Sequence, residues 1–252
     1  MTNYQWVFPD ILRPPVNGEV HIWRFKLNLE NEDYHQLSAF LSENELQRAN
    51  KLYNEKLKQR YIAARGQLKI LLGKYLGVSP KSLFFTLNEY GKPYLSQSFS
   101  GFYFNISHSG DMALAGFSAE FEVGVDIEYR RPSWNGMHIA RRFFSKDETE
   151  ALYTLPVGKQ RRAFFDCWCR KEAYIKARGT GLATPLKQFT VSVNPQQPAR
   201  LLSTEHDPLA VKEWTLKDIP VNQEYSGAAV VHAVNWQPRL FDAIHINKLM
   251  NG

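Results

Sequence analysis

The sequence predicts a mixed protein of the α+β (α/β) class. Two long stretches, 55–76 and 159–178, carry apolar residues at helical spacing, and each is followed by a glycine, Gly77 or Gly179, that ends the helix. Short segments around them alternate apolar with polar residues or are apolar throughout, as strands are. A chain of 252 residues can bury a sizeable core as one large domain or two small lobes.

The remaining elements are justified by capping and periodicity. Ser42 with Glu45, and Ser145 with Glu148, have the spacing of capping boxes, so a helix is expected to begin after each serine. A further short helix is expected over 137–144. Strands are expected at 19–27, 83–87, 102–106, 112–117, 123–128, 189–193, 211–216 and 227–236.

Two carboxylates stand out on the strand at 123–128. Apolar residues alternate there with polar or small ones, so Asp126 and Glu128 leave the same face of the strand. Gly124 precedes them on that face and is expected to keep it open. Taken alone, an Asp-x-Glu pair on a strand is also typical of a solvated sheet face.

A third carboxylate, Glu172, lies on the long helix at 159–178. Trp168, Glu172 and Lys176 are spaced four residues apart and therefore share one helix face. If that face meets the strand, three carboxylates converge, and such hard oxygen ligands suit Mg²⁺, which also binds substrate phosphates. The alternative for Glu172 and Lys176 is a surface ion pair worth roughly a few tenths of a kcal/mol.

Two polar segments are candidates for holding phosphate. The strand at 102–106 is predicted to run into a turn, Ser107-His108-Ser109-Gly110, whose hydroxyls, imidazole and backbone N–H groups suit an anion. Residues 88–93, Asn-Glu-Tyr-Gly-Lys-Pro, form a turn by composition, and a plain hairpin loop is the alternative. A Ser-His-Asp hydrolase is disfavoured, because the adjacent Ser107 and His108 point apart on an extended chain.

Taken together, these segments resemble the 4′-phosphopantetheinyl transferases of the Sfp type. That family carries a Gly-Lys-Pro turn, a Phe-Asn-x-Ser-His-Ser segment, a Gly-x-Asp-x-Glu strand and a Trp-x-x-Lys-Glu-x-x-x-Lys helix, and all four occur here in that order. The similarity begins at Phe40, with a Leu-Ser-x-x-Glu segment and a basic helix, and ends at Leu182. One position departs from the pattern, because Cys169 stands where Ser or Thr is common after the motif tryptophan.

The resemblance implies a fold and a domain organisation. Two similar lobes, related by a pseudo-twofold axis, are expected over residues 1–125 and 126–252, with coenzyme A bound between them near Asp126. Members of the family with both lobes in one chain resemble monomers, so the length of this chain favours a monomer.

The resemblance also implies an activity. The enzyme would transfer the 4′-phosphopantetheine group of coenzyme A to a serine of an apo acyl or peptidyl carrier protein and release adenosine 3′,5′-bisphosphate. Mg²⁺ on Asp126, Glu128 and Glu172 would hold the pyrophosphate. Either Glu172 or a metal-bound water would take the serine proton, and Lys176 would balance charge on the leaving group.

A further set of residues is implied to bind coenzyme A, namely Lys92, Pro93, Ser107, His108, Arg48, Lys51 and Arg60. The Ser-His pair would hold phosphate oxygens, and the Gly-Lys-Pro turn would flank the adenine nucleotide. The three basic helix residues would face the 3′-phosphate, with a solvated helix face as the alternative. In the family the carrier docks beyond the Asp-x-Glu strand, which makes Arg141 and Arg142 candidates for contacting it.

Composition is compatible with these partners. The net charge of +6 and the pI near 9.2 indicate an anionic partner, which could be coenzyme A, an acidic carrier or, by charge alone, nucleic acid. Cys167 and Cys169 diverge on a helix, so we expect reduced thiols and no disulfide. The N-terminus does not resemble a signal peptide, and no stretch is apolar enough to span a membrane, which favours a cytoplasmic protein.

Two other classes of function use some of the same residues. A metal-dependent nuclease could use the three carboxylates and Lys176, but it needs neither the Ser-His segment nor the Gly-Lys-Pro turn. A nucleotide-binding or nucleic-acid-binding module would not need three converging carboxylates, which repel phosphates in the absence of a metal. Nucleic acid is therefore not an expected partner.

Overall fold

The computed structural model describes residues 5–95, 99–133, 136–243 and 249, and its element order repeats once along the chain. Each repeat contains a strand, two short helices, a 22-residue helix, a two-stranded sheet and two further strands. The first comprises β1 (Glu19–Lys26), α1 (Asn31–Ser38), α2 (Glu43–Asn50), α3 (Glu55–Leu76), β2 (Phe85–Leu87), β3 (Pro93–Leu95), β4 (Tyr103–Ser109) and β5 (Met112–Ser118). The second comprises β6 (Val123–Tyr129), α4 (Gly136–Phe143), α5 (Lys146–Thr154), α6 (Val157–Arg178), β7 (Phe189–Val191), β8 (Leu201–Thr204), β9 (Thr215–Asp218) and β10 (Tyr225–Val231), with α7 (Ala210–Glu213) inserted before β9.

The two repeats build equivalent sheets. Strands β1, β5 and β4 are antiparallel neighbours in one sheet, as β6, β10 and β9 are in the other. The last strand, β11 (Gln237–Asp242), joins the first sheet in parallel beside β1. The expected mixed fold with two similar lobes is confirmed by this shared topology.

The division of the chain between the lobes follows the sheets. The expected boundary after residue 125 lies inside β6, because the second repeat begins at Val123. The chain also returns to the first sheet at β11. A division by sheet membership therefore differs from 1–125 and 126–252 at both places.

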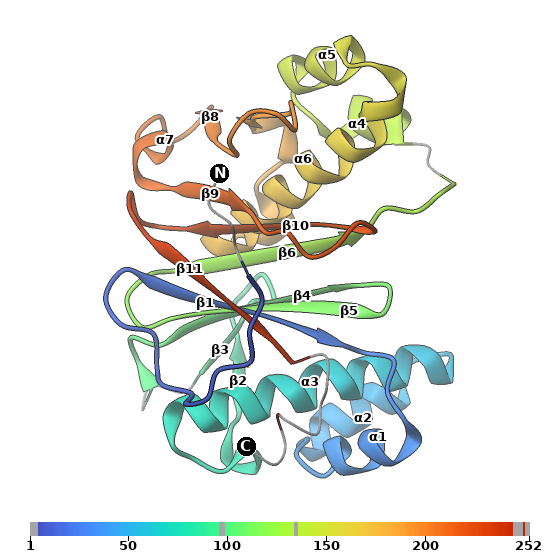
Figure 1. Ribbon diagram of the computed structural model, residues 1–252, viewed down its shortest axis with the longest axis vertical. Coiled ribbons are helices and arrows are strands. Elements are labelled where there is room, and N and C mark those ends of the chain that lie inside the picture. Colours follow the sequence, from blue (N-terminus) through green and yellow to red (C-terminus); the bar gives the residue numbers. More distant parts are fainter. Residues whose placement is uncertain (1–4, 96–98, 134–135, 244–248, 250–252) are drawn as a thin grey trace.

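Four layers stack in Figure 1: helices α1–α3, the first sheet, the second sheet, and helices α4–α6. One core lies between α3 and the first sheet and includes Trp23, Leu68 and Phe117. The core between the sheets includes Ile22 and Val125, and a third core lies under α6. No helix among the described residues combines the length and the apolar character needed to cross a bilayer.

The predicted helix ends are confirmed. Gly77 and Gly179 both adopt the left-handed conformation, with φ of 67°, in which a side chain would be strained. Capping boxes open α2 at Ser42 and α5 at Ser145, as their spacing predicts. Both cysteines are free and buried on α6, as expected.

Several strand predictions were wrong in extent. The predicted strand at 211–216 is instead helix α7 followed by β9, and the strand predicted to reach 236 ends at Val231. Residues 107–109 are not a turn but the second half of β4, and the turn follows at Gly110. Elements α1, β3, β8 and β11 were not predicted. β11 contains a proline and charged residues, and it is a strand only because β1 offers a free edge.

Candidate active site

Strand β6 presents its two faces to different layers. Val125 and Ile127 are fully buried in the core between the sheets. Asp126 and Glu128 alternate with them and lie on the opposite face, which packs against α6. Asp126 is 2% exposed, whereas Glu128 lies towards the end of the strand and is half-buried.

Gly124 determines how closely α6 approaches this face. A Cβ at Gly124 would overlap the carbonyl oxygen of Ala173 and the amide nitrogen of Ala177, both in the backbone of α6. The face is therefore not left open at Gly124, as we expected, but is filled by the helix backbone itself. Glu172 and Lys176 each directly precede one of these alanines, so this contact brings them close to Asp126.

Lys176 of α6 bonds directly to β6. Its ammonium nitrogen lies 2.5 Å from Oδ1 of Asp126 and 2.8 Å from Oγ of Ser107. Although burial opposes the charged form, Asp126 raises the pKa of Lys176 above its usual value. The ammonium is therefore held as a cation between Asp126 of β6 and Ser107 of β4.

The carboxyl groups disfavour one another's ionisation. Burial, reinforced by the charge of Asp126, raises the pKa of Glu128 to about 7. Burial and Asp126 also raise the pKa of Glu172. The positive charge near Asp126, Glu128 and Glu172 is therefore too small to keep the pKa values of the two glutamates at their usual level.

This arrangement fits a hard divalent cation in its chemistry. Oδ2 of Asp126 is buried and has no hydrogen-bond partner among the described residues, and the two neighbouring carboxyl groups have raised pKa values. Over the described ranges, however, no three His, Cys, Asp or Glu side chains are arranged as a ready-made metal site. Lys176 supplies the positive charge at Asp126 instead.

The Ser-His segment contributes two differently oriented side chains. Ser107 is buried and its hydroxyl donates to Oδ1 of Asp126 at 2.7 Å. His108 is on the other face of β4 and is exposed. Its pKa is lowered by desolvation and by the nearby cations of Lys176 and Arg60. Of this pair, His108 is the residue free to meet an anion.

The turn at 88–93 is fastened to the end of α6. The Asn88 amide donates to the carbonyl oxygen of Gly179 at 2.6 Å, and its Oδ1 accepts from the backbone N–H of Tyr90 and of Lys92. The Lys92 ammonium donates to Glu122 at 2.6 Å and to the carbonyl oxygen of Ala177 at 2.9 Å, and the residue is 8% exposed. Lys92 thus fixes the turn, and its charge is already engaged inside the protein.

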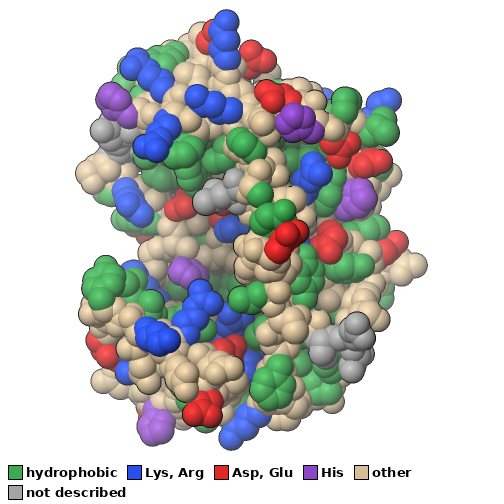
Figure 2. Space-filling model, turned by 180° about the vertical axis from the view of Figure 1, so that it is seen from behind, with side chains coloured by type: hydrophobic (Ala, Val, Ile, Leu, Met, Phe, Trp, Pro, Cys, Tyr) green, Lys and Arg blue, Asp and Glu red, His purple; other side chains and the backbone are tan. Residues whose placement is uncertain are grey.

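A cavity of about 270 Å³ joins these parts. It is lined by the turn at residues 90–93, by β4 at Asn105 and Ile106, and by α6 at Glu172 and Lys176. Pro93 and Glu172 therefore line the same cavity, while Asp126 and Glu128 are not among its lining residues. Figure 2 shows this face of the molecule hollowed between the lobes, with Lys and Arg side chains along the rim of the lower lobe.

The three basic helix residues occupy different environments. Arg48, on α2, and Lys51, directly after it, are exposed, and the Arg48 guanidinium lies over the Tyr61 ring. Arg60 is half-buried and donates to Oδ1 of Asp111 at 2.5 and 3.0 Å. Of these three residues, Arg60 is the one whose charge lowers the pKa of His108.

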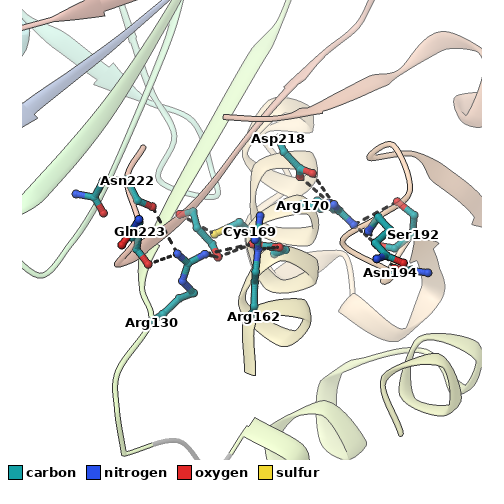
Figure 3. A network of polar contacts seen from close by, with 12 residues as sticks. Arg130, Arg162, Cys169, Arg170, Ser192, Asn194, Asp218, Asn222 and Gln223 are labelled. Atoms are coloured by element: carbon teal, nitrogen blue, oxygen red, sulfur yellow. Dashed lines mark hydrogen bonds and ion pairs between the residues drawn. The ribbon is translucent and has the colours of Figure 1, made fainter. Parts of the chain in front are cut away.

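The opposite side of α6 is anchored by residues whose role the sequence did not reveal. Arg170 donates to both carboxylate oxygens of Asp218, at 2.8 and 2.6 Å, and to the carbonyl oxygen of Ser192, and Figure 3 shows this network beside Arg130. Lys171 is fully buried and donates to both carboxylate oxygens of Glu148 at 2.7 Å. These ion pairs fix the rotation of α6 and hence which side chains face β6.

Cys169 also faces the second sheet. Its thiol donates to the carbonyl oxygen of Ser226 at 3.4 Å, and burial, together with nearby Asp126 and Glu128, raises its pKa well above the usual value. The Cys169 side chain therefore stays a neutral thiol, buried close to Asp126 and Glu128.

Comparisons with known proteins show which family this chain resembles. The family described as "4′-phosphopantetheinyl transferase superfamily" matches residues 122–230, and "4′-phosphopantetheinyl transferase, N-terminal" matches residues 28–119. The 4′-phosphopantetheinyl transferase HetI of Nostoc is 36% identical over 235 residues, which cover 91% of this chain and 96% of the relative. Sfp of Bacillus subtilis is 28% identical over 187 residues, 74% of this chain and 82% of the relative. The holo-[acyl-carrier-protein] synthase of Thermotoga maritima, at 19% identity, covers 45% of this chain and 64% of its own with a TM-score of 0.36, so the assignment depends on the sequence relatives.

Proposed function

This chain belongs to the 4′-phosphopantetheinyl transferase family, and we propose that Asp126, Glu128 and Glu172 form the metal site at which it cleaves coenzyme A. It is an enzyme that transfers 4′-phosphopantetheine from coenzyme A to a carrier protein. The observation that carries the site is the convergence of β6 and α6: a buried Asp126 with one unpartnered oxygen, beside two carboxyl groups of raised pKa.

The proposed reaction exchanges one P–O bond for another. The hydroxyl oxygen of a carrier serine attacks the phosphorus attached to pantetheine, and the bond from that phosphorus to the bridging pyrophosphate oxygen breaks. Adenosine 3′,5′-bisphosphate leaves. A Mg²⁺ ion bound by the three carboxylates would supply charge neutralisation for the pyrophosphate.

Residues of this chain have three tasks in that reaction. Glu172, whose pKa is raised by burial and Asp126, is suited to accept the serine proton. Lys176 projects from the same helix face and brings positive charge to the leaving group. His108, which is exposed on β4 and has its pKa lowered partly by the charges of Lys176 and Arg60, binds a phosphate oxygen of coenzyme A.

The nucleotide binds along the cavity wall. Pro93 and the backbone of the turn flank the adenine nucleotide, while Lys92 holds the turn in place through Glu122. Arg48 on α2, Lys51 directly after it and Arg60 on α3 serve the 3′-phosphate, and of these Arg60 is the one whose charge lowers the pKa of His108.

Further parts of the proposal concern the partner and the setting. The net charge of +6 suits an acidic acyl or peptidyl carrier. Both lobes lie in one chain, so a monomer suffices to complete the site, and reduced, buried thiols suit the cytoplasm. The nuclease and binding-module alternatives have no support among the relatives.

The test is direct. The protein is incubated with coenzyme A, Mg²⁺ and a panel of apo acyl and peptidyl carriers, and intact mass reports whether a carrier gains one phosphopantetheine group. An Asp126→Asn variant serves as the inactive control. Failure to modify any carrier, or transfer that persists in excess EDTA, would contradict the proposal.

A further inference from the structure

Strands β4 and β6 are edge strands of different sheets that lie side by side. In the described sheets β4 pairs through its backbone with β5, and β6 pairs with β10. The contact between β4 and β6 is extensive. Figure 1 shows it at the junction between the two central layers. What joins these two edges is a set of side chains.

Alternate side chains of β4 project towards β6, and these are Asn105, Ser107 and Ser109. Asn105 Oδ1 accepts from the backbone N–H of Val125 at 2.9 Å. The other two meet the carboxylates. Ser107 Oγ donates to Oδ1 of Asp126 at 2.7 Å. Ser109 Oγ donates to Oε2 of Glu128 at 2.8 Å.

The direction of each hydroxyl bond is fixed by a second partner. The Ser109 oxygen also lies 3.1 Å from the backbone nitrogen of Tyr129, which can only donate. The Ser107 oxygen lies 2.8 Å from the ammonium of Lys176, which likewise can only donate. Each hydroxyl therefore accepts one bond, and its single proton is left for a carboxylate oxygen.

This assignment gives Ser107 a role different from the one that the resemblance implies. Its proton is committed to Asp126 and its oxygen to Lys176, and the residue is 7% exposed. It has no donor left for a phosphate oxygen. His108, the next residue, faces the other way and is exposed, so the two members of the pair act on opposite sides of β4.

We propose that Ser107 and Ser109 are positioning residues that orient Asp126 and Glu128 for the metal. The inference depends on the proposed metal site. Because the bonds cross from the first sheet to the second, they also couple the geometry of two ligands to the packing of the lobes. Outer hydrogen bonds to metal-binding groups typically contribute about 10- to 100-fold in metal affinity.

The test measures Mn²⁺ binding to the whole protein without coenzyme A or carrier, by calorimetry or by loss of the free-Mn²⁺ EPR signal. We expect Ser109→Ala and Ser107→Ala each to weaken Mn²⁺ binding about 10-fold or more. Ser109→Thr keeps the hydroxyl in a strand-compatible side chain and should restore near-normal affinity. Ser203→Ala, an exposed strand serine of β8, is the matched control and should bind normally.

A second readout follows the apo protein. Loss of the Ser109 hydroxyl removes the acceptor for the Tyr129 amide, whose hydrogen exchange should accelerate in Ser109→Ala and not in Ser203→Ala. Unchanged Mn²⁺ affinity in Ser109→Ala, or an equal loss in Ser109→Thr, would overturn the positioning role while leaving the metal site standing. Absence of Mn²⁺ binding by the wild type would overturn the metal site, and with it this inference. Neither result bears on whether a carrier is modified.

Discussion

The ammonium of Lys176 lies 2.5 Å from Oδ1 of Asp126, so a cation from helix α6 neutralises the most buried carboxylate of the site. The other oxygen of Asp126, Oδ2, is buried, and no hydrogen bond reaches it from the part of the chain that the structure describes. Lys176 thus satisfies one of the two oxygens of Asp126, and the carboxyl groups of Glu128 and Glu172 lie close enough to have their pKa values raised by Asp126.

The first prediction concerns the carboxylates. Asp126→Asn, Glu128→Gln and Glu172→Gln should each lower transfer by about 10²-fold or more, because the pyrophosphate charge is then incompletely balanced. Single-turnover transfer at low Mg²⁺ measures this effect, and circular dichroism checks the fold. A variant with near-normal turnover would not have lost a metal ligand.

The second prediction uses the pH dependence of stability. The pKa of Glu128 is raised from 4.5 to about 7, so the folded protein binds a proton that the unfolded chain has lost, and stability falls as pH rises through that window. Glu128→Gln removes this loss and should stabilise the metal-free protein by about 1 kcal/mol at pH 8 but not at pH 4, after discounting for its partial exposure. Urea unfolding in EDTA at both pH values measures the difference. An equal effect at both would show that ionisation of Glu128 is not the cause.

The third prediction separates Lys176 from His108. Lys176→Ala should slow the chemical step by about 10²- to 10³-fold, as loss of a group that stabilises charge on the leaving group does. His108→Ala should mainly weaken coenzyme A binding, because its exposed imidazole is placed to contact phosphate. Single-turnover rates at saturating coenzyme A and thermal-shift titrations distinguish the two. Unchanged kinetics in Lys176→Ala would make the residue a structural ion pair alone.

The fourth prediction concerns the contact of strand and helix at Gly124. Gly124→Ala should destabilise the protein by about 3 kcal/mol or more and abolish transfer, because its Cβ would meet backbone atoms of α6 that cannot move aside. Gly158→Ala is the matched control. Gly158 lies near the start of α6, and no described atom is within 4 Å of the position that its Cβ would take. This substitution should be neutral or should stabilise the protein by about 0.5 kcal/mol. Urea unfolding compares them, and a Gly124→Ala protein of normal stability would show that the helix is free to shift.

The fifth prediction concerns carrier docking. Arg141 and Arg142 are exposed on α4, while Phe144 is buried and packs against Phe164. Reversing both charges, Arg141→Glu with Arg142→Glu, should raise the KM for an acidic carrier and leave coenzyme A affinity unchanged. The carrier KM should also rise with salt, since exposed charges are screened over about 10 Å at 0.1 M.

A control of equal charge tests the fifth prediction. Lys187→Glu with Lys212→Glu reverses two exposed charges elsewhere in the same lobe and should have a smaller effect on the carrier KM. If both double variants raised KM equally, net charge would be the cause. A normal KM in the Arg141 and Arg142 variant would place docking elsewhere.

Much of the site was readable along the chain because its elements are locally specified. Period-two alternation identified β6, and spacing by four placed Glu172 and Lys176 on one face of a helix ended by Gly179. The capping boxes at Ser42 and Ser145 likewise depend only on residues three apart. Such patterns are visible in sequence because the interacting groups are near neighbours.

The tertiary structure decided the relationships between distant segments. β4 continues through Ser109, where the polar Ser-His-Ser-Gly segment predicted a turn, because its backbone stays paired with β5 as far as Met112 and β6 offers partners to the side chains of Ser107 and Ser109. Lys92 is held by Glu122 and by the end of α6, so its direction depends on a helix far along the chain.

The sequence by itself thus determined which side chains each strand and helix presents, and the resemblance named the chemistry that they serve. Only the packing of α6 onto Gly124 and of β4 onto β6 decided which of those side chains meet. The physical reason is that periodicity orients a residue on its own element, whereas burial and hydrogen bonds to unpaired donors and acceptors select its partner on another.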